Sequence, residues 1–169
     1  MPALGAAMAA ESDLGSLRLA RGCRCFAAWD GPRVVAYGWL TRRSEWIGEV
    51  RLEIAPGPGE AYVWNCVTLP EHRRRGLFRA LLLFIRARSR EEGCSRLWIG
   101  SGGGGAEKAL AQAGFSPVLV LREHRLARWR RLQVAAASGA EPRAEAAARA
   151  VLGLDAQAGL GRRPGPRRH

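Results

Sequence analysis

The sequence has almost no lysine and no long apolar run. Lys108 is the only lysine, so 26 of the 27 basic residues are arginine. No apolar stretch reaches the roughly 20 residues that a helix needs to span a bilayer, which predicts no membrane association. The first residues include Glu11 and Asp13 and do not open on a basic segment, which argues against a secretory signal. We therefore expect a cytoplasmic protein.

The four cysteines, Cys23, Cys25, Cys66 and Cys94, contain no CxxC pair and have no histidine at zinc-binding spacing. Cys23 and Cys25 stand two apart in a strand-like run, so they point the same way and do not favour a disulfide with each other. The sequence therefore predicts reduced core thiols and no metal site.

A net charge of +12 suggests a nucleic-acid or anion-binding protein. A compositional bias is the stronger explanation, because arginine replaces lysine throughout and alanine and glycine are abundant. A nucleic-acid partner therefore stays the weaker alternative. Each arginine cluster has to be judged by its own position.

Strand and helix patterns alternate along the chain. In order they predict at most one short helix within 1–19, strands at 23–29 and 34–40 around the turn 30–32, a polar segment at 41–60, a strand at 61–69, a helix at 76–92, a strand at 95–99, a glycine loop at 100–105, a helix at 106–113, strands at 117–121 and 125–134, and a short helix at 141–152. In the helix at 76–92, the inward positions by period are Leu77, Leu81, Phe84, Ile85 and Arg88.

This order predicts a mixed sheet with helices packed on it, an α/β or α+β fold. The predicted parts are a short N-terminal segment at 1–19, a domain at 20–135, and an Ala/Arg/Gly/Pro-rich tail at 136–169. The tail is expected to be partly helical, with residues 161–169 disordered.

The segment Val67–Leu82, VTLPEHRRRGLFRALL, gives the clearest indication of a functional site. A strand ends there, the chain turns, and a helix opens at Gly76 behind a run of arginines. The unpaired N–H groups of a first helical turn and the helix dipole favour an anion. Glycine lets a ligand approach the backbone, and arginine donates charge-assisted hydrogen bonds to phosphate. A solvated basic helix start is the alternative.

At this segment the sequence resembles the GCN5-related N-acetyltransferase superfamily. The signature Gln/Arg-x-x-Gly-x-Gly/Ala stands here as Arg73-x-x-Gly76-x-Phe78 after Pro70-Glu71-His72. The resemblance extends to the hairpin Phe26–Leu40 and to the helix that closes on a Gly-Phe pair, Ala109–Phe115. It implies a mostly antiparallel sheet with flanking helices, a shortened N-terminal part, and an opening between two parallel strands for the pantetheine arm of acetyl-CoA.

Carried over by position, the resemblance implies that the backbone of Cys66, Val67 and Thr68 pairs with pantetheine. It also implies that the loop holds the pyrophosphate through Arg73, Arg74, Arg75, Gly76, Leu77, Phe78 and Arg79. The implied activity is direct transfer of acetyl from acetyl-CoA, with no metal, to a small-molecule or peptide amine. Whether the protein forms a homodimer is left open.

Three positions depart from the family pattern. Phe78 replaces a small residue, Leu110 stands where members often carry the tyrosine that protonates the leaving thiolate, and Gly103 stands where many have asparagine. A thiol is already a fair leaving group, and a general acid contributes about 10²–10⁴-fold. Loss of the tyrosine therefore need not abolish transfer.

A base must take the proton of the acceptor's ammonium group. In some relatives a glutamate early in the fourth strand does this, and the matching position is Tyr62, with Glu60 one pleat earlier on the same face. Glu60 is the preferred candidate and Tyr62 the second, with a solvated carboxylate and a packing residue as their alternatives. His72 and His124 are weaker candidates.

Two other functions compete. A catalytically degenerate module could bind acyl-CoA, RNA or a protein partner, as the missing tyrosine and asparagine allow. The run Gly100–Gly105, with Glu123 about twenty residues on, also fits a dinucleotide-binding pattern formally. The short helix behind it and the lack of strands for a doubly wound sheet argue against a nicotinamide enzyme.

Overall fold

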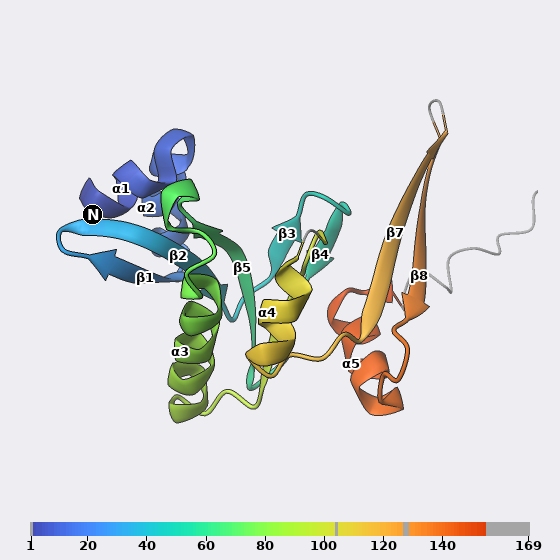
Figure 1. Cartoon of the computed structure of the whole chain (residues 1–169). Coiled ribbons are helices and arrows are strands. Elements are labelled where there is room, and N and C mark those ends of the chain that lie inside the picture. The colour runs from blue at the N-terminus through green and yellow to red at the C-terminus, as the bar shows by residue number, and fades with distance from the viewer. Residues whose placement is uncertain (1, 104, 127–128, 155–169) are drawn as a thin grey trace, which may run out of the picture. The chain divides into compact units, whose positions relative to one another are not determined.

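The computed structural model describes residues 2–103, 105–126 and 129–154. The elements are α1 Pro2–Met8, the 3-10 turn η1 Ala9–Glu11, α2 Ser12–Ala20, β1 Arg24–Asp30, β2 Arg33–Thr41, β3 Glu45–Ile47, β4 Leu52–Ile54, β5 Glu60–Thr68, the 3-10 turn η2 Pro70–His72, α3 Leu77–Glu91, β6 Arg96–Ile99, α4 Ala106–Gln112, β7 Leu119–Leu126, β8 Trp129–Ala136 and α5 Pro142–Val151 (Figure 1). The chain divides into two compact units. The first comprises Met1–Arg43 and Pro56–Ser116, and the second Ser44–Ala55 and Pro117–His169.

The first unit is built on a four-stranded sheet in the order β1-β2-β5-β6. β1 and β2 form the predicted hairpin, with Asp30 opposite Arg33, and β2 pairs antiparallel with β5. β5 and β6 run parallel. The sheet is therefore mixed and mostly antiparallel, which confirms the predicted fold class.

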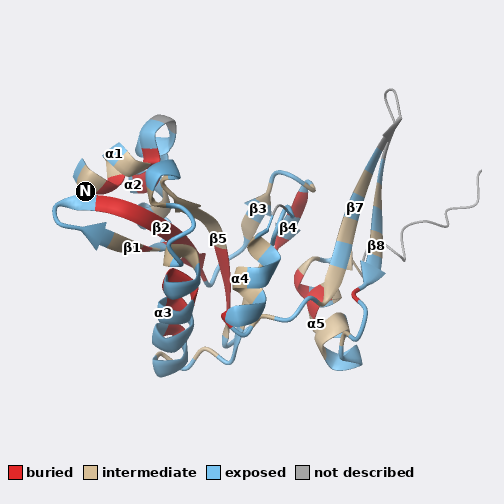
Figure 2. Ribbon diagram, in the orientation of Figure 1, coloured by how far each residue is buried: buried red, intermediate tan, exposed pale blue. Residues whose placement is uncertain are grey.

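Each face of this sheet has its own core, because side chains alternate between the faces along a strand. Leu40 of β2 packs with Leu82 and Ile85 of α3. Its neighbour Trp39 points the other way and packs with Leu4 of α1. Figure 1 accordingly shows α1 and α3 on opposite sides of the sheet, and Figure 2 shows β2 as its most deeply buried strand.

The buried face of α3 is rotated from the predicted one. The residues that bury are Leu81, Leu82, Ile85 and Ser89. Phe84, predicted to face inward, is 60% exposed and meets Phe26 only edge-on, with ring centroids 6.0 Å apart. Arg88, also predicted on the inward face, is exposed. Leu82 and Ser89 lie near the centre of the buried face. Phe84 is therefore at the margin of that face.

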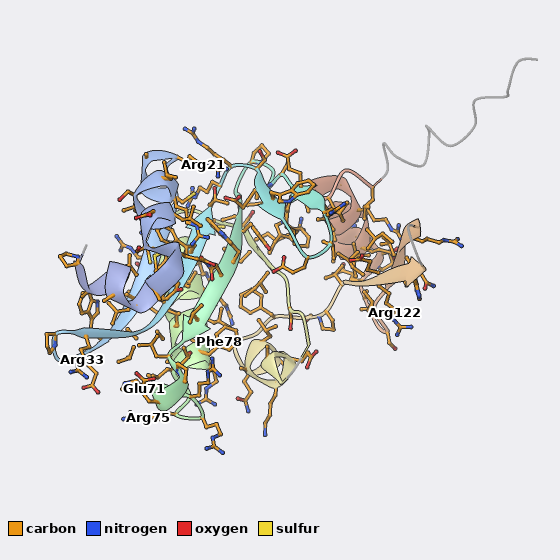
Figure 3. The ribbon with its side chains drawn as sticks, turned by 90° about the horizontal axis from the view of Figure 1, so that it is seen from above. Arg21, Arg33, Glu71, Arg75, Phe78 and Arg122 are labelled. Atoms are coloured by element: carbon orange, nitrogen blue, oxygen red, sulfur yellow. The ribbon has the colours of Figure 1, made fainter. Side chains whose placement is uncertain are left out.

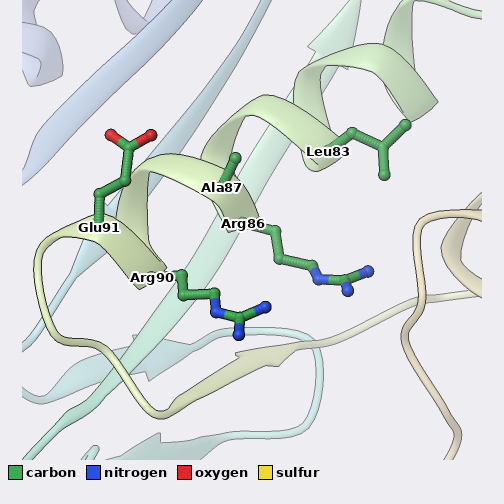
Figure 4. Close-up of a pocket in the computed structure, with 5 residues that line it drawn as sticks. All are labelled: Leu83, Arg86, Ala87, Arg90 and Glu91. Carbon is green, nitrogen blue, oxygen red and sulfur yellow. The ribbon is translucent and has the colours of Figure 1, made fainter.

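One flank of α3 carries basic side chains that include Arg86 and Arg90 (Figure 4). Nη1 of Arg86 donates a hydrogen bond of 2.8 Å to the backbone oxygen of Ala113, just beyond α4. The side chain therefore satisfies one of the carbonyl groups that the end of α4 leaves unpaired. This contact joins α3 to α4 within the first unit.

The second unit consists of two hairpins and a helix. β3 pairs with β4, and β7 pairs with β8 in an unbroken register. The backbone N–H of Ala55 donates to the oxygen of Val151 at 2.7 Å, and that of Ala137 donates to the oxygen of Val118 at 2.9 Å. The predicted strands near 117–121 and 125–134 and the helix at 141–152 are confirmed, while residues 161–169 lie outside the described part.

Two predictions for weakly patterned segments are wrong. Residues 1–19 contain α1 and nearly all of α2 instead of at most one helix, because Leu4 and Met8 bury against the sheet and stabilise α1. Residues 41–60 contain the β3-β4 hairpin, in which Leu52 and Ile54 are buried on either side of exposed Glu53. Three residues of alternation are too few to stand out in a sequence.

The four cysteines are free thiols, as predicted. In the described part of the chain, no helix has both the length and the apolar character to cross a membrane.

Candidate functional site

Strand β5 is paired along only part of one edge. β6 pairs with it from Glu60 to Val63 and ends at Ile99, whereas β5 continues to Thr68. On the other edge the register with β2 shifts at Asn65, whose φ is 44°, and this marks a β-bulge. Beyond Val63 the β6 side of β5 therefore presents backbone groups that β6 does not pair. An extended ligand can add there as a further strand.

The turn from β5 into α3 has a strained backbone. After η2, Arg74 has a φ of 60° and Gly76 a φ of 77°. The left-handed conformation costs a residue with a side chain roughly 1–2 kcal/mol, and such strain concentrates at ligand sites. The N–H groups of a first helical turn have no partner within the helix, and no side-chain cap at the start of α3 supplies one. The turn thus offers donors and partial positive charge to an anion.

Arginine side chains surround this turn and hold it in place. Nε of Arg73 donates to the oxygen of Thr68 at 3.2 Å, which ties the loop to the end of β5. Nη1 of Arg75 lies 3.0 Å from Nδ1 of His72, and Nη1 of Arg79 donates to Oε1 of Gln112 in α4 at 3.2 Å. Figure 3 shows Arg75 beside Glu71 at this turn. Each arginine keeps further donors for a phosphate.

Phe78, which departs from the family pattern, is half-buried. Its ring packs against the core on the α3 side of the sheet, and Figure 3 shows it next to the sheet. The large side chain is therefore directed to the core, where a small residue would leave space. Leu110, at the position of the family tyrosine, also packs against this core.

Glu60 lies at the start of β5 with both carboxylate oxygens engaged. Oε1 accepts from Nη1 of Arg96 at 2.7 Å, and Oε2 accepts from Nε1 of Trp98 at 2.8 Å and from the N–H of Gly57 at 3.2 Å. Burial would raise the pKa of Glu60, but the hydrogen bonds from Trp98, Gly57 and Arg96 outweigh it and lower the pKa. These contacts favour a structural role. The predicted role as general base remains a prediction.

Tyr62 is buried and stacks on Trp64, with centroids 6.0 Å apart and an interplanar angle of 6°. Its hydroxyl approaches Gly100, just after the end of β6, where an added Cβ would stand 3.7 Å from the oxygen. The ring thus packs against Trp64 on the same face of β5, while its hydroxyl lies near the point where the pairing of β5 with β6 ends. Because of the position of its hydroxyl, Tyr62 remains a candidate for the proton path.

The two candidate histidines belong to different units. His72 lies in η2 beside Arg75, and His124 lies in β7, 3.1 Å from Oε1 of Gln133. His72 therefore lies in the same unit as the turn and the edge of β5, whereas His124 belongs to the second unit. Among the described residues, no group of three His, Cys, Asp or Glu side chains gathers as a metal site would require.

Sequence reasoning missed two features of this region. Asn65 holds the bulge, and because asparagine tolerates positive φ better than most residues, an asparagine inside an apolar strand was a usable signal. Glu11 lies on η1 but contacts β5, since its Oε2 accepts from Nδ2 of Asn65 at 2.8 Å. No local pattern indicates a contact across 54 residues.

Comparison with known families identifies the fold. A family model described as the acetyltransferase (GNAT) family matches residues 6–115. The match covers more than half of the chain and includes the hairpin, β5, the arginine-rich turn and α3. The chain belongs to the GNAT acetyltransferase family. The bulged strand, its unpaired edge and the strained turn all lie within the matched residues, and acetyl transfer is the general activity of the family.

Several solved structures are similar to this GNAT chain at low identity. A GCN5-related N-acetyltransferase from Ralstonia eutropha is 24% identical, with a TM-score of 0.48, over 66% of this chain and 72% of that one. An acetyltransferase from Trypanosoma brucei is 20% identical (TM-score 0.47, 68% and 75%). One from Bacillus subtilis, solved in complex with CoA, is 16% identical (0.47, 65% and 62%). No curated protein matches the chain. These values are too low to carry substrates or residue roles across.

Proposed function

We propose that this GNAT protein is an N-acetyltransferase that moves the acetyl group of acetyl-CoA to an amine. The observation that carries the proposal is the continuity of two features in one segment. The unpaired edge of β5 at Cys66–Thr68 leads directly into the strained turn Arg73–Gly76 and the uncapped start of α3. In CoA the pantetheine arm is an extended chain with two amides that is joined to a pyrophosphate, so CoA presents the matching groups in the same order.

The proposed cofactor residues fall into two sets. The backbone of Cys66, Val67 and Thr68 hydrogen-bonds the amides of pantetheine as an added strand. The backbone N–H groups from Arg74 to Arg79 hold the pyrophosphate, and arginine side chains of the turn neutralise its charge. No metal is required, because donors and positive charge are already supplied by the chain.

The proposed reaction is direct transfer in a ternary complex. The neutral amine attacks the thioester carbonyl carbon, a C–N bond forms, and the C–S bond breaks. The nitrogen loses a proton to a base or to water, and CoA leaves as a thiolate that takes up a proton. Because a thiol pKa lies near 8.5, the thiolate is a fair leaving group even with leucine at position 110.

Two measurements test this function. Acetyl-CoA should raise the melting temperature of the protein, because a ligand that binds only the folded state stabilises it by about 2.7 kcal/mol at one hundred times its Kd. Release of free thiol should then depend on an added amine. Absence of a thermal shift at millimolar acetyl-CoA would contradict the assignment.

A catalytically degenerate module is the second candidate. The engaged oxygens of Glu60 and the leucine at position 110 favour it. Such a protein would show the thermal shift with acetyl-CoA but no thiol release with any acceptor. A salt-dependent shift of RNA by the first unit would support a nucleic-acid partner instead.

A further inference from the structure

This inference rests on the proposed function and concerns where the acceptor binds. If pyrophosphate occupies the turn after Thr68 and pantetheine follows the edge back along β5, the thioester reaches the level of Trp64 and Asn65. The pairing of β5 with β6 ends next to them, at Val63 and Ile99. The acceptor's amino group must reach the acetyl carbonyl at this level of the strand.

The structure holds a carboxylate at this level. Oε2 of Glu11 accepts hydrogen bonds from Nδ2 of Asn65 at 2.8 Å and from Nη2 of Arg18 at 3.2 Å. In the described part of the chain, Oε1 of Glu11 accepts no hydrogen bond, and the side chain is 47% exposed. Two donors therefore fix one oxygen and leave the other to a further donor. By contrast, both oxygens of Glu60 are engaged.

The side chain of Arg18 is itself held by the sheet. Its guanidinium carbon lies 5.3 Å from the centroid of the Trp39 ring, only 15% of the side chain is exposed, and it contacts Glu11 through one nitrogen. A largely buried cation above an aromatic face is attracted to that face, which restrains its position. Arg18 and Asn65 thus orient Glu11 from two directions.

The rest of this surface is aromatic. Trp64 stacks on Tyr62 and lies 6.3 Å from Trp39, and Trp64 and Val67 pack on the α1 side of the sheet. Burial, and then the charge of Glu11, raises the pKa of Tyr37 on this side, so its phenol stays neutral. Burial raises the pKa of Cys25 to about 11, and that thiol is neutral too. Of the ionisable side chains named on this side of the sheet, Glu11 and Arg18 are therefore the charged ones.

We propose that Glu11 binds the ammonium group of the acceptor through Oε1 before the nitrogen gives its proton to water and attacks as the neutral amine, which makes this chain selective for amines that are cationic at neutral pH. Glu11 reaches β5 from the α1 side of the sheet, whereas Leu77 and Phe78, at the start of α3, pack on the other side. The acceptor can thus approach the thioester from the side that the phosphate turn leaves open.

The test compares two nucleophiles in three proteins. Glu11→Gln keeps the shape and can still accept from Asn65 and Arg18, but it lacks the charge. Glu91→Gln, on the exposed end of α3, is the control. Thiol release from acetyl-CoA is measured with tyramine, a cation at neutral pH, and with hydroxylamine, which is uncharged there, and the rate without protein is subtracted for each nucleophile. Kd for CoA and the melting temperature are recorded for each protein.

Glu11→Gln should raise KM for tyramine at least about tenfold, which is about 1.4 kcal/mol, with kcat within threefold. The hydroxylamine rate and Kd for CoA should stay unchanged, as should all values for Glu91→Gln. An unchanged KM for tyramine, equal losses with both nucleophiles, or no tyramine turnover by an unmodified protein that binds CoA would each overturn the inference. If the unmodified protein does not bind CoA, the proposed function fails and the inference with it.

Discussion

Gly38 of β2 lies directly against the thiol of Cys66 in β5: a Cβ added to Gly38 would stand 2.8 Å from Sγ. Leu81 and Ile85 of α3 bound the same space, each with a methyl carbon 3.5 Å away. Burial, with a smaller contribution from Cys25, raises the pKa of Cys66 to about 12, so the thiol is a neutral packing group. This contact fixes the strand whose edge is the proposed pantetheine site.

Gly38→Ala should therefore destabilise the protein. Inserting a methyl group into a filled core commonly costs about 1–3 kcal/mol, and the Cys66 thiol would have to shift, since 2.8 Å is shorter than a normal contact. Urea unfolding should show a lower midpoint with an unchanged slope. In a Cys66→Ala background the same substitution should cost much less, because the two sites share one space and are not additive. Equal costs in both backgrounds would contradict this packing.

A matched pair of glycines separates backbone strain from cofactor binding. Gly76 and Gly93 have φ values of 77° and 76°, and an added Cβ at either meets no atom within 4 Å. Alanine should cost each site a similar amount, about 1–2 kcal/mol. Only Gly76→Ala should also weaken acetyl-CoA binding, at least about tenfold, because only Gly76 lies in the phosphate turn. Urea unfolding measures the stability cost and titration calorimetry the affinity for acetyl-CoA, and equal affinities of the two variants would argue against the turn as the phosphate site.

The regular elements of the first unit could be predicted from sequence because their patterns are local. The hairpin around Asp30-Gly31 and the buried strand β5 follow from turn chemistry and β-branched residues. The helix at Gly76 follows from periodicity. In contrast, α1 depends on Leu4 packing against a strand more than thirty residues away, and propensity alone does not show such a contact.

The candidate site was predictable in part for the same reason. The turn Arg73–Arg79 is contiguous, so its motif is visible in the sequence. The surroundings of Glu60 are not, because Arg96 and Trp98 come from β6, which meets β5 only in the folded sheet. The contact of Glu11 with Asn65 likewise joins η1 to β5. Motifs identify a site's backbone, whereas its charge pattern depends on tertiary contacts.

Removal of residues 137–169 should leave acetyl-CoA affinity within a few-fold. Every proposed cofactor residue lies in the first unit, whereas α5 contacts Ala55 in the second. Loss of the Ala55–Val151 hydrogen bond should lower the stability of the second unit without touching the turn after β5. A truncated protein that folds but loses more than about tenfold in affinity, or about 1.4 kcal/mol, would show that the tail contributes.

The last prediction separates a structural role for Glu60 from a catalytic one. The folded pKa of Glu60 is lowered relative to an unfolded value near 4.3. The carboxylate therefore contributes stability that is fully present above the unfolded pKa and is lost as pH falls through the folded pKa. Glu60→Gln should lower the melting temperature at pH 7, and the difference from the unmodified protein should shrink below about pH 4. Trp98→Phe, which removes the indole donor, should reduce the pH-dependent part of that difference. For catalysis, we expect Glu60→Gln to keep the shape of the pH–rate profile of the unmodified protein. If Glu60 is instead the general base, turnover at neutral pH falls by about 10²–10⁴ and recovers as the amine deprotonates near pH 10. That recovery, found with little change in melting temperature, would exclude the structural role.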